Sequence, residues 1–178
     1  MEYPKFSGLE SDAVLVSPHL KISASYEWER DIRLFNAFHG LNNQIHVFVI
    51  LFNATSGLQA ALSQREYWRG GNKNEFTICL GLDDAQNVKW CKAFSWCDLP
   101  QMETALESWY LEHTHLDFKE LTNWLEANVS TLWKRKEFKD FKYLGKKLTP
   151  WKSVLVGFLT LAACALFIYI AYYLTTTQ

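Results

Sequence analysis

Three aspartates come closest to a chemical site in this sequence. Asp83 and Asp84 begin a polar turn between two apolar segments, and Asp98 follows the second of those segments. Because hard divalent cations prefer several carboxylate oxygens, these side chains are candidate metal ligands if the fold brings them together. Turn initiation and helix capping also favour aspartate at such positions. We therefore predict structural roles and no metal site, with Asp83, Asp84 and Asp98 as the residues to test.

Other short motifs lack the residues that would complete a reaction centre. Gly70-Gly71-Asn72-Lys73 offers backbone N–H groups and a lysine to an anion, but it lacks the spacing of a phosphate-binding loop. It also follows a predicted helix, so a helix stop is the favoured interpretation. His113 and His115 have no third zinc ligand nearby. No C-x-x-C pair occurs among the four cysteines, which we predict to be reduced structural thiols: Cys79, Cys91, Cys97 and Cys164. No motif identifies a catalytic residue or requires a cofactor.

Hydrophobic spacing predicts the elements that position these residues. The segment 24–39 is predicted to be a helix, because Trp28, Ile32, Phe35 and Phe38 recur at helical spacing and Gly40 follows. The segment 45–52 is β-branched and aromatic throughout, which favours a central strand buried on both faces. A second helix is predicted over 57–69, with four apolar positions toward the core, and it ends at the glycine pair. Those positions are Leu58, Ala61, Leu62 and Trp68.

The second half of the domain is predicted to contain a hairpin and two helices. Strands over 75–82 and 88–96 flank the turn at 83–87. Asp98 and Asp117 each begin a sequence typical of a helix N-terminus, and Pro100 falls in the first turn of the earlier helix. A strand, helix and strand in succession require a parallel crossover, whereas the hairpin adds an antiparallel strand. We expect an α/β domain at 24–133 with a small mixed sheet covered by helices, after an irregular lead at 1–23.

The order of these elements resembles that of the TPM domain. The resemblance covers about 24–132 and rests on a buried strand, a helix ending near glycine, an apolar strand, and a strand that carries Lys89 and Lys92. TPM domains are membrane-associated modules, some implicated in phosphatase activity and others in the maintenance or assembly of membrane proteins. The glycine-rich stretch that follows the third strand in that family is here Phe94-Ser95-Trp96-Cys97-Asp98.

Charge is divided unevenly along the chain. Residues 1–133 carry 10 Lys and Arg against 17 Asp and Glu, whereas 134–178 carry 8 against 2. This acidic domain is a poor partner for nucleic acid, while the basic segment 134–152 favours an anionic lipid surface. Its Phe and Leu spacing predicts an amphipathic helix in the headgroup layer. The predicted lipid-surface residues are Lys134, Arg135, Lys136, Lys139, Lys142, Lys146, Lys147, Trp151 and Lys152.

The segment 153–174 is predicted to be a transmembrane helix, and 175–178 follow it. No charged residue occurs from Val154 to Leu174, a length that matches the hydrocarbon core of a bilayer. Basic residues precede this segment and none follow it, so the N-terminal domain is expected on the cytoplasmic side. The first residues lack the pattern of a signal peptide, which favours insertion by a C-terminal tail anchor.

Small side chains form a stripe along the predicted span, at Ser153, Gly157, Thr160, Cys164 and Ala171. Such stripes allow close helix approach, so self-association or association with other membrane proteins is expected. We therefore predict a tail-anchored protein whose cytoplasmic domain is an interaction or assembly module. Two alternatives stay open. One is a TPM-like hydrolase of phosphate esters, and the other is a pore or lysis protein formed by oligomerised spans.

Overall fold

The computed structural model of the chain describes 12–71, 74–97, 99–137 and 150–176, and at 150, 153, 171 and 174–176 it describes the backbone alone. The chain divides into two compact units, Met1–Lys136 and Glu137–Gln178. Each unit is described by itself below.

The first unit alternates strands and helices before it ends in two successive helices. In chain order its elements are β1 (Val14–Val16), α1 (Tyr26–Asn43), β2 (His46–Asn53), η1 (Ala54–Ser56), α2 (Gly57–Tyr67), β3 (Glu75–Leu82), β4 (Val88–Ser95), α3 (Pro100–Glu112) and α4 (Phe118–Leu132). The predicted α/β class with a mixed sheet is confirmed.

The sheet has the strand order β1-β2-β3-β4. β1 and β2 are parallel, with Val14 opposite Val49, and β2 and β3 are parallel along their whole length. β4 returns antiparallel to β3 as the predicted hairpin, with a register shift between Gly81 and Leu82. The strand predicted to be central, β2, therefore lies between two parallel neighbours.

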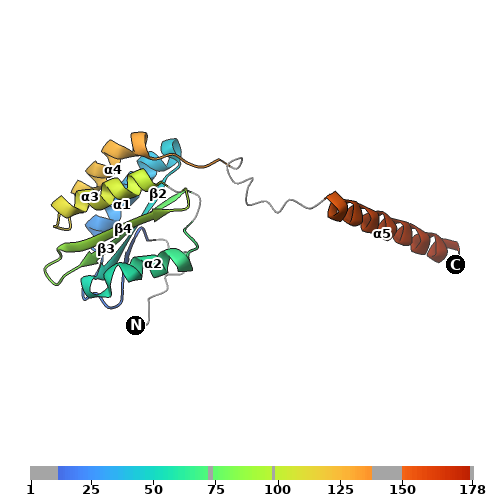
Figure 1. Cartoon of the computed structure of the whole chain (residues 1–178), viewed down its shortest axis with the longest axis horizontal. Helices are drawn as coiled ribbons and strands as arrows, with labels where there is room; N and C mark the ends of the chain where they lie inside the picture. Colours follow the sequence, from blue (N-terminus) through green and yellow to red (C-terminus); the bar gives the residue numbers. More distant parts are fainter. Residues whose placement is uncertain (1–11, 72–73, 98, 138–149, 177–178) are drawn as a thin grey trace. The chain divides into compact units, whose positions relative to one another are not determined.

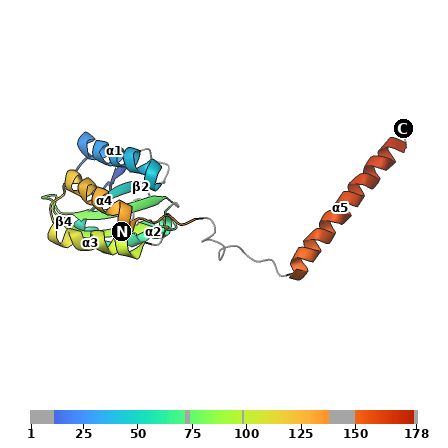
Figure 2. The same cartoon turned by 90° about the horizontal axis from the view of Figure 1, so that it is seen from above.

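The two faces of the sheet are covered unequally. α1, α3 and α4 cover one face, and α2 alone covers the other (Figures 1 and 2). β2 supplies both cores, because Val47, Val49 and Leu51 pack under α1, whereas Ile50 and Phe52 pack against α2. Since β1, β2 and β3 are parallel neighbours in order while α1 and α2 lie on opposite faces, the two crossovers have opposite hands. One of them is left-handed, which is rare.

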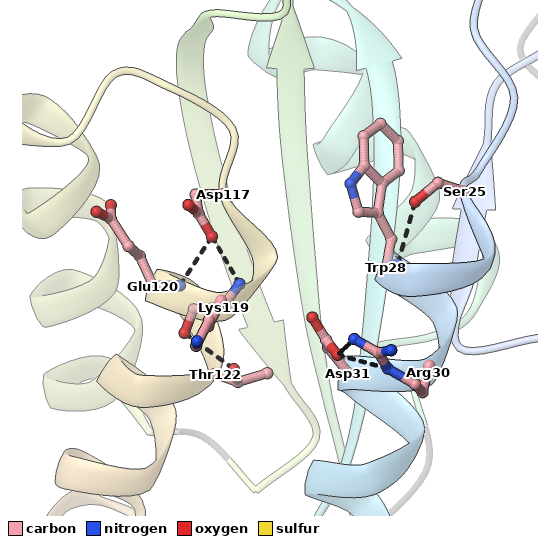
Figure 3. A network of polar contacts seen from close by, with 8 residues as sticks. All are labelled: Ser25, Trp28, Arg30, Asp31, Asp117, Lys119, Glu120 and Thr122. Carbon is pink, nitrogen blue, oxygen red and sulfur yellow. Dashed lines mark hydrogen bonds and ion pairs between the residues drawn. The ribbon is translucent and has the colours of Figure 1, made fainter.

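Side-chain caps fix where α1 and α4 begin (Figure 3). The hydroxyl of Ser25 accepts the backbone N–H of Trp28 at 3.2 Å. The carboxylate of Asp117 accepts the N–H groups of Lys119 and Glu120 at 2.8 and 3.1 Å. Such caps satisfy donors that a helix leaves unpaired at its N-terminus. The cap predicted at Asp117 is confirmed. At α3 the capping position is Leu99 with Pro100 next to it, and Asp98 lies outside the described residues.

Helix side chains also close the edges of the short sheet. β1 pairs only with Val49–Leu51, so Val47 has no strand partner on that side. The Asn36 amide takes its place, accepting the N–H of Val47 at 2.7 Å and donating to its carbonyl at 2.9 Å. The Glu29 carboxylate accepts the N–H groups of Ala13 and Val14. At the opposite edge Glu107 of α3 accepts the N–H of Ala93 at 3.2 Å. Because an open strand edge invites association, these contacts protect the sheet.

Two predicted core faces differ from the observed ones. In α1 the buried residues are Ile32 and Phe35, whereas Phe38 is exposed and His39 stacks on Phe35. A helix turns about 100° per residue, so position 39 and not 38 follows 28, 32 and 35 on one face. In α2 the core face consists of Ala60, Ala61 and Gln64, so the assignment of Leu58 and Leu62 to the core was wrong.

The second unit contains α5 (Pro150–Thr176), a helix of 27 residues. The side chains of α5 are described without interruption over 154–170. Counting only described residues, no helix is both long and apolar enough to cross a membrane.

We predict that Asn36→Ala destabilises the first unit. The substitution leaves the N–H and carbonyl of the fully buried Val47 unpaired, so the free energy of unfolding should fall by about 2–4 kcal/mol in urea denaturation. Asn42→Ala, on the exposed side of the same helix, is the control and should change that free energy by less than about 0.5 kcal/mol. Equal effects of the two substitutions would contradict a structural role for the Asn36 amide.

Candidate functional site

The carboxylate of Asp83, the first candidate metal ligand, bonds to groups within the hairpin turn. Its carboxylate accepts the N–H groups of Ala85 and Asn87 at 3.0 and 2.8 Å. It also lies 3.0 Å from the ammonium of Lys89. These interactions, with the backbone N–H of Asn87 as the largest, lower the pKa of Asp83 from 3.8 to about 2. Asp83 therefore holds the turn together.

No described residues form a cluster that would hold a metal ion. Within that part of the chain, no three His, Cys, Asp or Glu side chains gather closely enough to bind one. Asp84 lies in the same turn as Asp83, and Asp98 lies outside the described residues. The geometry at Asp83 is that of a turn-forming aspartate.

The glycine pair and the histidine pair both lie at helix ends. After α2, Gly70 and Gly71 have φ angles of 90° and 84°, and the N–H of Gly70 bonds to the carbonyl of Arg65 at 2.7 Å. This is how a helix terminates through left-handed residues. After α3, Nδ1 of His113 lies 3.0 Å from the carbonyl oxygen of Trp109, and the imidazole stacks on the indole of Trp109. His115 forms an isolated bridge with Asn87. Lys73 lies outside the described residues.

A cavity of 360 Å³ lies where α3 passes the edge of β4. Its lining includes Leu58, Cys91, Glu107 and Tyr110. Burial raises the pKa of both the Cys91 thiol and the Tyr110 hydroxyl well above their ordinary values. Both groups are therefore protonated at neutral pH, which makes them poor nucleophiles. Glu107 is already bonded to the ammonium of Lys92 at 2.8 Å and to the β4 backbone. This arrangement packs α3 against β4 and offers no nucleophile paired with a base.

The predicted lipid-surface residues fall partly within the described chain. Lys134, Arg135 and Lys136 follow α4 outside any helix or strand, and Trp151 and Lys152 are exposed in the first turn of α5. The remaining four lie outside the described residues: Lys139, Lys142, Lys146 and Lys147. The predicted amphipathic helix therefore stays a prediction.

The α5 helix exposes large apolar side chains along its described length. Phe158 and Phe167 expose 69% and 74% of their surface, and Val154, Leu161 and Ile168 are similar. From the predicted stripe of small residues, Gly157, Thr160 and Cys164 are exposed, and the Thr160 hydroxyl donates to the carbonyl of Val156 at 2.9 Å. The side chains of Ser153 and Ala171 are not described.

An exposed apolar surface on α1 was not anticipated from the sequence. Leu34, Phe38 and Leu41 expose 48%, 69% and 85% of their surface, and Ala37 lies exposed between them. Their positions repeat at spacings of three and four, so they form one stripe of the helix. We call Leu34, Ala37, Phe38 and Leu41 the α1 patch. The spacing of Leu34, Phe38 and Leu41 was the available signal, but Phe38 had been assigned to the core face.

No protein-family model matches this chain, and no curated protein or solved structure matches it significantly. The resemblance to the TPM domain therefore stays a prediction.

We predict that Lys89→Ala raises the pKa of Asp83 from about 2 toward 3.8 without reaching it, because the N–H of Asn87 still donates. The lowered pKa means that the Asp83 interactions stabilise the fold above about pH 4 and weaken as the pH falls toward 2. In Lys89→Ala this loss should be smaller and should be complete at a higher pH, because the folded-state pKa of Asp83 lies closer to 3.8. A carboxyl titration by NMR measures the shift. Lys92→Ala, which removes the partner of Glu107, serves as control and should leave the Asp83 titration unchanged. An Asp83 titration that Lys89→Ala also leaves unchanged would contradict the interaction between Asp83 and Lys89.

Proposed function

We propose that this chain is a single-pass membrane protein whose α/β domain is an interaction or assembly module at the cytoplasmic surface. The proposed span is 153–174. The observation that carries this proposal is the exposure of large apolar side chains along α5. Burying each such side chain is favourable by about 1.5–3 kcal/mol, so water is a poor environment for this helix.

The length of α5 is compatible with this role. A helix of 27 residues is about 40 Å long, and a membrane span needs about 20 apolar residues. The described interval 154–170 is shorter than that, so the proposed span also uses 153 and 171–174 as read from the sequence. Trp151 at one end, and Tyr169, Tyr172 and Tyr173 toward the other, are residue types that favour the interface between lipid and water.

The proposed orientation rests on the charge distribution. Eight Lys and Arg residues occur between 134 and 152, and none follow. Basic residues flanking a span favour the cytoplasmic side, which would place the α/β domain there. The same residues attract anionic lipid, at about 1 kcal/mol for each residue close to the surface.

The proposed activity of the domain is binding. The described residues include no metal-ligand cluster, and the polar groups near the cavity between α3 and β4 pack α3 on β4. We infer that the domain acts by binding partners at its surface. The small-residue stripe of α5 supports self-association within the membrane as a second route to assembly.

Membrane integration is tested with charged substitutions in α5. We expect wild type to stay in the membrane fraction after alkaline carbonate extraction, and Leu161→Asp combined with Leu166→Asp to be released. Each aspartate near the centre of a span opposes insertion by about 2.5–3.5 kcal/mol. The matched control combines Leu58→Asp with Leu62→Asp, two exposed leucines of α2 at comparable spacing. Release of the wild-type protein by carbonate would contradict the proposed anchor.

The small-residue stripe is tested by enlarging its members. Gly157→Leu combined with Cys164→Leu should reduce self-association of the full chain in a bilayer by at least about fivefold, as measured by energy transfer between labelled copies. Ala162→Leu combined with Ala165→Leu enlarges small residues away from the stripe and should leave association unchanged. If both pairs of substitutions reduce self-association equally, the stripe is not the association surface.

A further inference from the structure

The α1 patch is continuous with a part of α1 that lacks charged side chains. The sequence from Leu34 to Asn43, LFNAFHGLNN, contains no Lys, Arg, Asp or Glu. Earlier in the helix, Glu27, Glu29 and Asp31 alternate with Arg30 and Arg33. Acidic residues therefore gather at the N-terminal half of α1, and the exposed Phe38 and Leu41 lie in the uncharged half.

A single hydrogen bond places the start of the basic segment beside the patch. The indole N–H of Trp133 donates to the carbonyl of Asn43, the last residue of α1, at 2.9 Å. Trp133 is itself held in the core, where its ring lies 6.2 Å from that of Phe76. Lys134, Arg135 and Lys136 follow directly, so the basic run begins at the end of α1 that carries Leu41. In Figure 1 the end of α4 lies beside this end of α1.

An apolar patch bordered by basic residues has the composition of a lipid-contacting surface. Peripheral membrane surfaces combine apolar side chains that enter the headgroup boundary with Lys and Arg that attract anionic headgroups. The rest of the domain is acidic, with 17 Asp and Glu against 10 Lys and Arg over 1–133, and would be repelled by such a membrane. The corner formed by the α1 patch and Lys134, Arg135 and Lys136 carries basic residues beside apolar ones.

We propose that the α1 patch, with Lys134, Arg135 and Lys136 at its border, rests in the headgroup layer of an anionic bilayer and fixes which face of the domain is turned to the membrane. This inference rests on the proposed membrane anchor. It leaves the α2 side of the sheet, with Leu58 and Leu62, turned away from lipid and available to partners.

A second copy of the chain is a less suitable occupant of this patch. Stable protein interfaces bury about 800 Å² on each partner, which four side chains on one helix do not provide. An anionic bilayer can contact both the apolar and the basic part of this surface, because apolar side chains enter the headgroup boundary and basic side chains attract the headgroups.

The test uses the full chain in bilayers with a photoreactive residue, p-benzoylphenylalanine, in place of Phe38. Irradiation in bilayers that contain phosphatidylserine should give a phospholipid adduct detectable by its mass. The control carries the probe in place of Leu62 on α2. Adduct yield at position 38 should exceed that at position 62 by at least about fivefold, the factor contributed by one basic residue near an anionic surface. It should fall when the lipid is phosphatidylcholine alone.

A third probe, in place of Phe167 in α5, separates failure of this inference from failure of the anchor. Lipid adducts at 167 but not at 38 would overturn the orientation proposed here and leave the anchor intact. A cross-link between two chains at 38 would assign the patch to self-association and likewise overturn it. If neither 38 nor 167 labels lipid, the proposed membrane anchor fails as well. Adducts at 38 and 167 with little at 62 support the inference.

Discussion

The exposure of apolar side chains along α5 is the constraint on which the account of this chain depends. Phe158, Phe167 and their neighbours are exposed over most of their surface. Such a helix needs an apolar environment, which a bilayer provides while the helix satisfies its own backbone hydrogen bonds. A bilayer around α5 would also explain the charge distribution. Basic residues precede the helix, where they would meet the membrane surface, and the acidic domain lies further along the chain from it.

In the α/β domain, side chains from the helices bind the backbone at the edges of a small sheet. Asn36 pairs with the backbone of β2 beyond the N-terminal end of β1, and Glu107 binds the outer edge of β4. These contacts fix α1 and α3 against the strands. The apolar surfaces that the described part of the domain exposes include helix faces. The α1 patch is one of them, and the exposed leucines of α2 form another.

Much of the fold could be predicted from local patterns, whereas the placement of helices on faces could not. Strands 75–82 and 88–95, the turn at Asp83 and the cap at Asp117 follow from short-range chemistry. β2 is apolar on both sides, so its sequence cannot indicate that α1 and α2 cover opposite faces with crossovers of opposite hand. Counting spacings of three and four assigned Phe38 to the core side of α1, although at 100° per residue position 39 lies there, and this concealed the exposed patch. The structural role of Asn36 depends on where β1 ends, and no local pattern encodes it.

The central claim, that α5 spans a bilayer, is tested most directly by the depth of a nitroxide attached to Cys164, which is exposed near the middle of the proposed span. Collisions with oxygen and with a water-soluble nickel complex report that depth in reconstituted full-length chain. The account predicts high oxygen and low nickel accessibility at Cys164, and the reverse for a label on Trp151→Cys. Equal, water-like nickel accessibility at both positions would contradict it.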